Sequence, residues 1–175
     1  RYRPQTGTFK DYLINVATFR PGKGQDVLIE AYLQLIREGI RAALVLVGRT
    51  TPHLSRLRSQ VRRHGLHEHV FFLPDLDHAH TLAAIHKAKL LVQPSHDEPF
   101  GLPLLEAMSC GTPVIYGDNS SMPEIVGNAG LAVDSPGAAA GVAEALALRM
   151  DSMRLRSVLL LSAMGEDLCD QGIDF

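Results

Sequence analysis

The chain has 175 residues, enough for one α/β domain with a sizeable core. Its net charge of −2, its low aromatic content of 6% and the absence of Trp argue against a nucleic-acid partner. No apolar run is long enough to cross a bilayer, and neither Cys110 nor Cys169 belongs to a CxxC pair, so we expect no direct membrane contact, no disulfide framework, reduced thiols and a cytoplasmic location.

The first half of the chain alternates between apolar strands and amphipathic helices. A helix is predicted over residues 25–37 because its apolar residues, from Val27 to Ile36, recur at helical spacing. Residues 42–47 are apolar on both faces and end at Gly48, as in a central parallel strand. The remaining elements predicted here are strands over 12–17 and 70–73 and helices over 53–63 and 77–88.

The second half continues the alternation. Ser121 and Glu124 have the spacing of a capping box, and Pro136 suits a first helical turn. The predicted strands cover 90–92, 113–116 and 130–133, and the predicted helices cover 102–110, 121–126 and the residues from 136 onward. We assign residues 1–150 to one domain and residues 151–175 to a helical tail of the same domain.

This alternation predicts an α/β fold, a Rossmann-like doubly wound parallel sheet of about six strands with helices on both faces. Ligands of such sheets bind outside the carboxyl ends of the strands. The loops that follow strands are therefore the places to search for a site. They cover residues 18–24, 48–52, 74–77, 93–101 and 117–121.

The segment 94–115 holds the most informative of these loops. Gly101 allows close backbone approach to a ligand or a positive φ, and Pro103 suits the first turn of the helix that follows. The free amides and the dipole at that helix start form an anion site that fits a diphosphate. Glu98 and Glu106 bracket it, and each carboxylate can accept hydrogen bonds from a pair of sugar hydroxyls.

The order of these residues resembles that of the retaining glycosyltransferases of family 4, which have the GT-B fold. Seven residues separate Glu98 from Glu106, with Phe-Gly-Leu among them and Glu-Ala-Met at the end. The similarity continues through Cys-Gly-Thr-Pro-Val-Ile over 110–115 and Ser-Ser-Met-Pro-Glu-Ile-Val-Gly over 120–127, and upstream to Lys23-Gly24 and Gly48. It covers about residues 12–150.

The resemblance implies that this chain is the donor-binding half of a two-domain enzyme, whose acceptor-binding N-terminal domain is missing here. The implied reaction is transfer of a hexose, with retention, from a nucleotide diphosphate sugar to a hydroxyl, without a metal or other cofactor. Any peripheral membrane association would then belong to the missing half, and this fragment alone would be inactive. GDP-mannose is the first guess for the donor.

Residue roles follow from the same resemblance. Glu98 would contact the transferred sugar, Glu106 would hold the ribose, and Lys23 would neutralise the diphosphate. Backbone amides would come from Phe100, Gly101 and Leu102, with Gly48 also in the donor site. Many members of the family carry an arginine where this chain has Thr18 or Gly22, so Arg20 is the candidate for the second basic residue.

Several competing interpretations are open at this point. The domain could bind a nucleotide or nucleotide sugar without turnover, or it could belong to an enzyme similar to starch or glycogen synthases or to sucrose-related enzymes. Arg49 is interpreted as a surface residue. The histidine-rich segment 64–69 is interpreted as a solvated loop, and Asp77 as a helix cap, in preference to metal sites.

Overall fold

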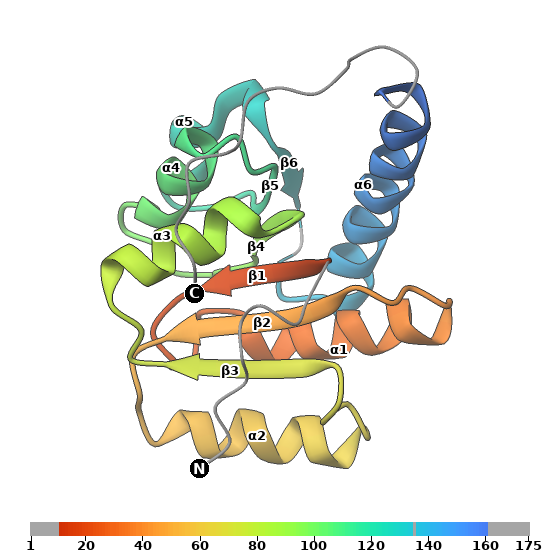
Figure 1. Cartoon of the computed structure of the whole chain (residues 1–175). Helices are drawn as coiled ribbons and strands as arrows, with labels where there is room; N and C mark the ends of the chain where they lie inside the picture. Colours follow the sequence, from red (N-terminus) through yellow and green to blue (C-terminus); the bar gives the residue numbers. More distant parts are fainter. Residues whose placement is uncertain (1–10, 135, 161–175) are drawn as a thin grey trace.

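A computed structural model of the chain describes residues 11–134 and 136–160, with a single parallel sheet at its centre (Figure 1). The sheet has the strand order β3-β2-β1-β4-β5-β6. Its strands are β1 (Tyr12–Val16), β2 (Ala43–Gly48), β3 (Val70–Pro74), β4 (Leu90–Gln93), β5 (Val114–Gly117) and β6 (Leu131–Val133). The predicted doubly wound sheet is therefore confirmed.

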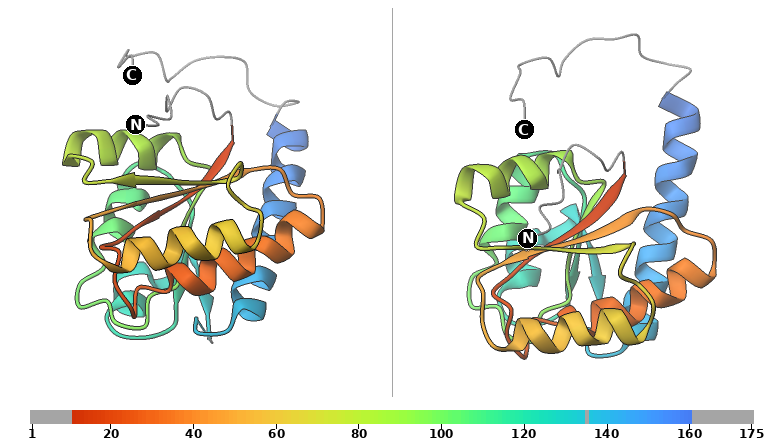
Figure 2. Two further views of the ribbon diagram at one scale, coloured as in Figure 1. Left: turned by 90° about the horizontal axis from the view of Figure 1, so that it is seen from below. Right: turned by 60° about the horizontal axis from the view of Figure 1, so that its bottom comes forward.

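Helices cover both faces of the sheet (Figure 2). They are α1 (Gln25–Arg37), α2 (His53–Arg63), α3 (His78–Lys87), α4 (Leu102–Ser109), α5 (Met122–Val126) and α6 (Ala139–Leu160), with a short 3-10 helix, η2, over Gly127–Ala129. The helices α1, α2 and α6 cover one face, and α3, α4 and α5 cover the other. Among the described helices, none is both long and apolar enough to cross a membrane.

The strand sequences explain why two cores form. In a strand, successive side chains point to opposite faces, so the apolar residues of β2 divide between the two layers. Leu44 and Leu46 pack toward α1 and α2, whereas Val45 and Val47 pack toward α3 and α4. A sheet buried on both sides needs such continuous apolar strands, which is the pattern that residues 42–47 show.

The ends of two helices differ from the sequence predictions. The predicted capping box at Ser121 is wrong: the Ser121 hydroxyl donates to the Glu98 carbonyl, at 3.0 Å, and makes no cap hydrogen bond to α5. Helix α6 begins at Ala139, after a turn in which Gly137 lies against the His96 ring. It runs through residue 150, the predicted domain boundary, and residues 161–175 lie outside the described residues.

The direction in which the chain adds successive strands to the sheet reverses between β1 and β4, while the two strands themselves are parallel. These strands are neighbours, with Leu13 opposite Leu90, although the chain first builds β2 and β3 on the far side of β1. The helices that follow β1 and β4, α1 and α4, lie on opposite faces of the sheet. Such a switch point forms a crevice at the carboxyl ends of the strands, which is where ligands of such sheets bind.

Candidate functional site

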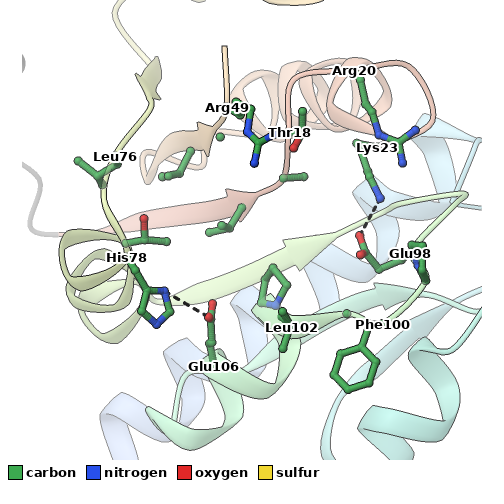
Figure 3. A pocket seen from close by; sticks show the side chains of 18 of the residues that line it. Thr18, Arg20, Lys23, Arg49, Leu76, His78, Glu98, Phe100, Leu102 and Glu106 are labelled. Atoms are coloured by element: carbon green, nitrogen blue, oxygen red, sulfur yellow. Dashed lines mark hydrogen bonds and ion pairs between the residues drawn. The ribbon is translucent and has the colours of Figure 1, made fainter. Parts of the chain in front are cut away.

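A cleft of about 670 Å³ lies at this crevice (Figure 3). It is formed by the β1–α1 loop (17–24), the β2–α2 loop (49–52), the β3–α3 loop (75–77) and the β4–α4 loop (94–101), together with the starts of α3 and α4. Every predicted site residue lines it, and their roles remain predictions at this point. These residues are Arg20, Lys23, Gly48, Glu98, Phe100, Gly101, Leu102 and Glu106.

The β1–α1 and β4–α4 loops lie in direct contact. The His96 amide donates to the Gly22 carbonyl at 2.9 Å, so the two loops are joined by a backbone hydrogen bond. Gly24 has a φ of 69°, and a Cβ at this position would lie 1.9 Å from the Pro94 carbonyl oxygen. Glycine is therefore required at position 24 for two reasons, the left-handed backbone and the close approach.

This contact brings Lys23 and Glu98 together. The Lys23 ammonium lies 3.1 Å from Glu98 Oε2, and the two side chains are only 8% and 14% exposed. The same ammonium also donates to the Asp97 carbonyl. A lysine ammonium has three donors, so one N–H remains for a ligand in the cleft. The pair places a cation and a carboxylate side by side at the end of the crevice.

Two buried amides lie behind Glu98, and the sequence reasoning missed both. Gln93 Nε2 donates to Glu98 Oε2 at 3.1 Å, and Asn15 Nδ2 donates to Gln93 Oε1 at 3.1 Å. Both residues are fully buried in the central strands β1 and β4. The signal available in the sequence was a polar residue within each of two apolar strands, but their contact depends on the pairing of β1 with β4.

Arg20 lies at the outer end of the cleft. Its guanidinium lies 3.2 Å from a carboxylate oxygen of Asp97, and these side chains are 45% and 63% exposed. Such an exposed ion pair contributes at most about 1 kcal/mol. An arriving anion can therefore compete with Asp97 for the guanidinium, which leaves Arg20 within the cleft as a second cation beside Lys23.

The start of α4 has the helix-start conformation that the sequence predicted, and anion binding there remains a prediction. Gly101 is the N-cap, with a φ of 67°, and Pro103 lies in the first turn. First-turn amides carry the positive end of the helix dipole, but Pro103 has no N–H and the Leu104 amide already donates to the Gly101 carbonyl at 2.9 Å, which leaves the amides of Gly101 and Leu102 for a ligand. The side chains of Phe100 and Leu102 are exposed.

Glu106 lies across the mouth of the cleft from α3. Its Oε1 lies 3.6 Å from His78 Nδ1, and the Glu106 side chain is 21% exposed while His78 is 72% exposed (Figure 3). The separation is beyond a hydrogen bond, and the imidazole is largely in solvent. Glu106 therefore retains acceptor capacity toward the cleft.

The far wall of the cleft contains a second pair of joined loops. The Thr50 amide and hydroxyl donate to the two carboxylate oxygens of Asp75, at 2.8 and 2.5 Å, and these bonds lower the Asp75 pKa. A Cβ at Gly48 would lie 1.9 Å from the Ala17 carbonyl oxygen, so only glycine fits where β2 ends. Arg49 also lines the cleft here and is exposed, in agreement with its interpretation from the sequence as a surface residue.

The segments weighed as metal sites make other contacts. Asp77 caps α3, as predicted, by accepting a hydrogen bond from the His80 amide at 2.9 Å. His64 pairs with Glu30 of α1 at 2.9 Å. Within residues 11–134 and 136–150, no three His, Cys, Asp or Glu side chains are grouped so that they could hold a metal ion.

Solved structures confirm the fold. The chain superposes on sucrose-phosphate synthase from Thermosynechococcus elongatus with a TM-score of 0.72 and 31% identity, over 85% of this chain and 39% of that one. The Anabaena protein HepE, in complex with UDP-glucose, gives a TM-score of 0.74 and 25% identity, over 87% and 42%. A glycosyltransferase C-terminal domain from Francisella tularensis gives 0.74 and 26%, over 89% and 86%, which agrees with a C-terminal half.

Curated relatives cover the same region. The chain is 38% identical to O-antigen chain mannosyltransferase B of Escherichia coli over 130 residues, which is 72% of this chain and 33% of the relative. It is 35% identical to a glycogen synthase of Mycobacterium tuberculosis over 150 residues, 85% of this chain and 36% of the relative. It thus spans about a third of the length of these relatives. The family model "Glycosyl transferases group 1" matches residues 3–159, and the chain belongs to that family.

Proposed function

We propose that this chain binds a nucleotide diphosphate sugar and is the donor-binding half of a retaining hexosyltransferase. The observation that carries the proposal is the Lys23–Glu98 pair, at 3.1 Å, placed beside the start of α4 in the cleft. Cations and helix-start amides suit a diphosphate, and carboxylates suit the hydroxyls of the attached sugars. An acceptor-binding N-terminal domain would complete the enzyme.

The proposed roles follow the positions in the cleft. The diphosphate lies against the α4 start and Lys23, with Arg20 as the second cation. Glu98 accepts from hydroxyls of the transferred hexose, and Glu106 accepts from those of the ribose. As the bond to the leaving phosphate breaks, the sugar develops oxocarbenium character and the diphosphate gains negative charge. Fixed positive groups aimed at that charge stabilise the transition state.

We propose that these groups suffice without a metal ion and that the departing phosphate oxygen accepts the proton of the acceptor hydroxyl. GDP-mannose is the first donor to test, because mannosyltransferases of Escherichia coli and Mycobacterium leprae are among the relatives. UDP-glucose and ADP-glucose belong in the same series, since HepE was solved with UDP-glucose and a glycogen synthase is also a relative.

The test begins with the 175-residue chain. Calorimetric titration with the three nucleotide sugars should give saturable binding of at least one, weakened about tenfold or more by Glu106→Ala, since a bond to a charged group is worth about 1.5–3 kcal/mol. In the complete enzyme, Glu98→Ala should lower transfer by orders of magnitude and weaken donor binding much less. Turnover should persist in EDTA. No binding of any donor, or wild-type turnover in Glu98→Ala, would contradict the proposal.

One observation favours a second candidate, a binding module without turnover. Thr18 and Gly22 stand where many members of the family carry an arginine, and Arg20 is paired with Asp97. If Arg20 cannot reach the diphosphate, stabilisation of the leaving group is weaker. Addition of the acceptor-binding half separates the two candidates, because the module would bind the donor and still transfer nothing.

A further inference from the structure

The centre of the sheet contains a buried polar pair that the fold itself does not need. Asn15 in β1 and Gln93 in β4 are both fully buried, between apolar neighbours in each strand. Burial of an amide is unfavourable unless it is hydrogen-bonded. An apolar pair of the same shape would serve folding nearly as well or better. The role of the two amides must therefore be inferred from the groups to which they are hydrogen-bonded.

The hydrogen bonds fix the direction of both amides. The Val92 carbonyl can only accept, so Asn15 must present its NH₂ group to it, at 2.8 Å. The second proton of that group reaches Gln93 Oε1 at 3.1 Å. The Gln93 NH₂ group is thereby turned toward Glu98 Oε2, also at 3.1 Å. The Asn15 side-chain oxygen, by contrast, has no hydrogen-bond partner among the described residues. The two hydrogen bonds that the Asn15 NH₂ group donates therefore account by themselves for the orientation of this amide.

Two donors of different kinds thus meet at one oxygen. Lys23 Nζ and Gln93 Nε2 each lie 3.1 Å from Glu98 Oε2. An ammonium on a flexible stem can move to a stronger anion, and the proposed ligand brings a diphosphate into the same cleft. The Gln93 amide is buried and fixed by Asn15, so the ligand cannot draw it away.

We infer that Gln93, oriented by Asn15, is a positioning residue that holds Glu98 in place toward the transferred sugar while Lys23 turns to the diphosphate. This inference rests on the proposed function. Without Gln93, the carboxylate would be held only by the lysine, and donor binding would remove that support. Gln93 should therefore matter for contacts to the hexose and not for contacts to the nucleotide.

The experiment compares two ligands in each variant of the 175-residue chain. Calorimetry gives the dissociation constants of the best-bound nucleotide sugar, from UDP-glucose, GDP-mannose and ADP-glucose, and of its nucleoside diphosphate. Gln93→Met keeps the side-chain length and removes the donor. We expect this substitution to weaken binding of the nucleotide sugar about tenfold, the loss typical of a hydrogen bond to a charged group, and to leave the dissociation constant of the nucleoside diphosphate unchanged.

Matched variants separate positioning from folding. Gln60→Met removes another buried glutamine, which bonds to Asp26 and Glu30 on the α1–α2 side, and should change neither constant. The double variant Asn15→Leu/Gln93→Met replaces the whole polar pair, so it should fold even if Gln93→Met alone does not, and should show the same selective loss.

Each outcome has one meaning. A selective loss for the nucleotide sugar in Gln93→Met or in the double variant supports the inference. Equal constants in wild type and these variants, or a parallel loss for both ligands, would overturn it and leave the proposed function intact. A wild-type chain that binds neither ligand would overturn the proposed function and, with it, this assignment.

Discussion

Substitution of Gly24 by alanine tests the contact that joins the two loops of the site. The left-handed backbone, with φ at 69°, costs an L-residue about 1–2 kcal/mol. The added Cβ would also lie 1.9 Å from the Pro94 carbonyl oxygen, and backbone cannot rotate away as a side chain can. Overpacking of this kind costs about 1–3 kcal/mol. Gly24→Ala should therefore lower the free energy of unfolding by roughly 2–5 kcal/mol.

Gly111 provides the matched control for this substitution. Its φ is 71°, and a Cβ there would have no neighbour within 4 Å, so Gly111→Ala should cost only the conformational share, about 1–2 kcal/mol. Urea unfolding of both variants measures the difference. Calorimetry should show weaker nucleotide-sugar binding in Gly24→Ala alone, because only there do the loops that carry Lys23 and Glu98 separate. Equal losses of stability in the two variants would refute the steric reasoning.

Three further predictions concern the rim of the cleft. Arg20→Ala should change the free energy of unfolding by less than about 1 kcal/mol, because its ion pair is exposed, yet weaken nucleoside diphosphate binding in calorimetry, most at low salt. His78→Ala should change nucleotide affinity less than about threefold, since its imidazole is mostly in solvent, and a loss as large as that of Glu106→Ala would contradict this. Hydrogen bonds from Thr50 lower the Asp75 pKa below 3.8, so the stabilisation that Asp75 provides is present above pH 3.8 and is lost as the pH falls through the lowered pKa. In urea unfolding at a series of pH values, the difference in free energy of unfolding between wild type and Asp75→Asn should therefore shrink over that range. A difference that stays constant with pH would exclude the carboxylate as its source.

Local patterns were sufficient to predict the sheet and the start of α4, whereas Lys23 and Gly48 were placed in the site by the resemblance to family 4 glycosyltransferases. Residues 42–47 revealed a central strand because both of its faces are buried, and Asp77 was recognisable as a cap because the amide that donates to it, that of His80, lies within the same chain segment. Gly101 and Pro103 marked the start of α4 for the same local reason. Each of these features depends on residues only a few positions apart.

Contacts between loops could not be predicted in this way. Ser121 has the sequence of a helix cap, but its hydroxyl donates to the Glu98 carbonyl, 23 positions away. Arg49 is exposed, as predicted, but its place beside the cleft depends on how β2 ends against β1. The contact of Asn15 with Gln93, 78 positions apart, requires the pairing of β1 with β4, which no local pattern contains.

The two joined pairs of loops form two halves of the cleft that remain connected to each other, because the Phe19 amide donates to the Arg49 carbonyl at 3.2 Å and the Thr51 hydroxyl donates to the Phe19 carbonyl. One half is held by the hydrogen bond from His96 to Gly22, and the other by the bonds from Thr50 to Asp75. Because Thr50 and Asp75 bond to each other whereas Thr51 bonds to the β1–α1 loop, Thr50 and Asp75 can be varied with Thr51 retained, so that the loop that carries Lys23 keeps this contact. A library designed to change which nucleotide the protein accepts should be confined to the Thr50–Asp75 side, so that binding preference and bond cleavage are engineered separately.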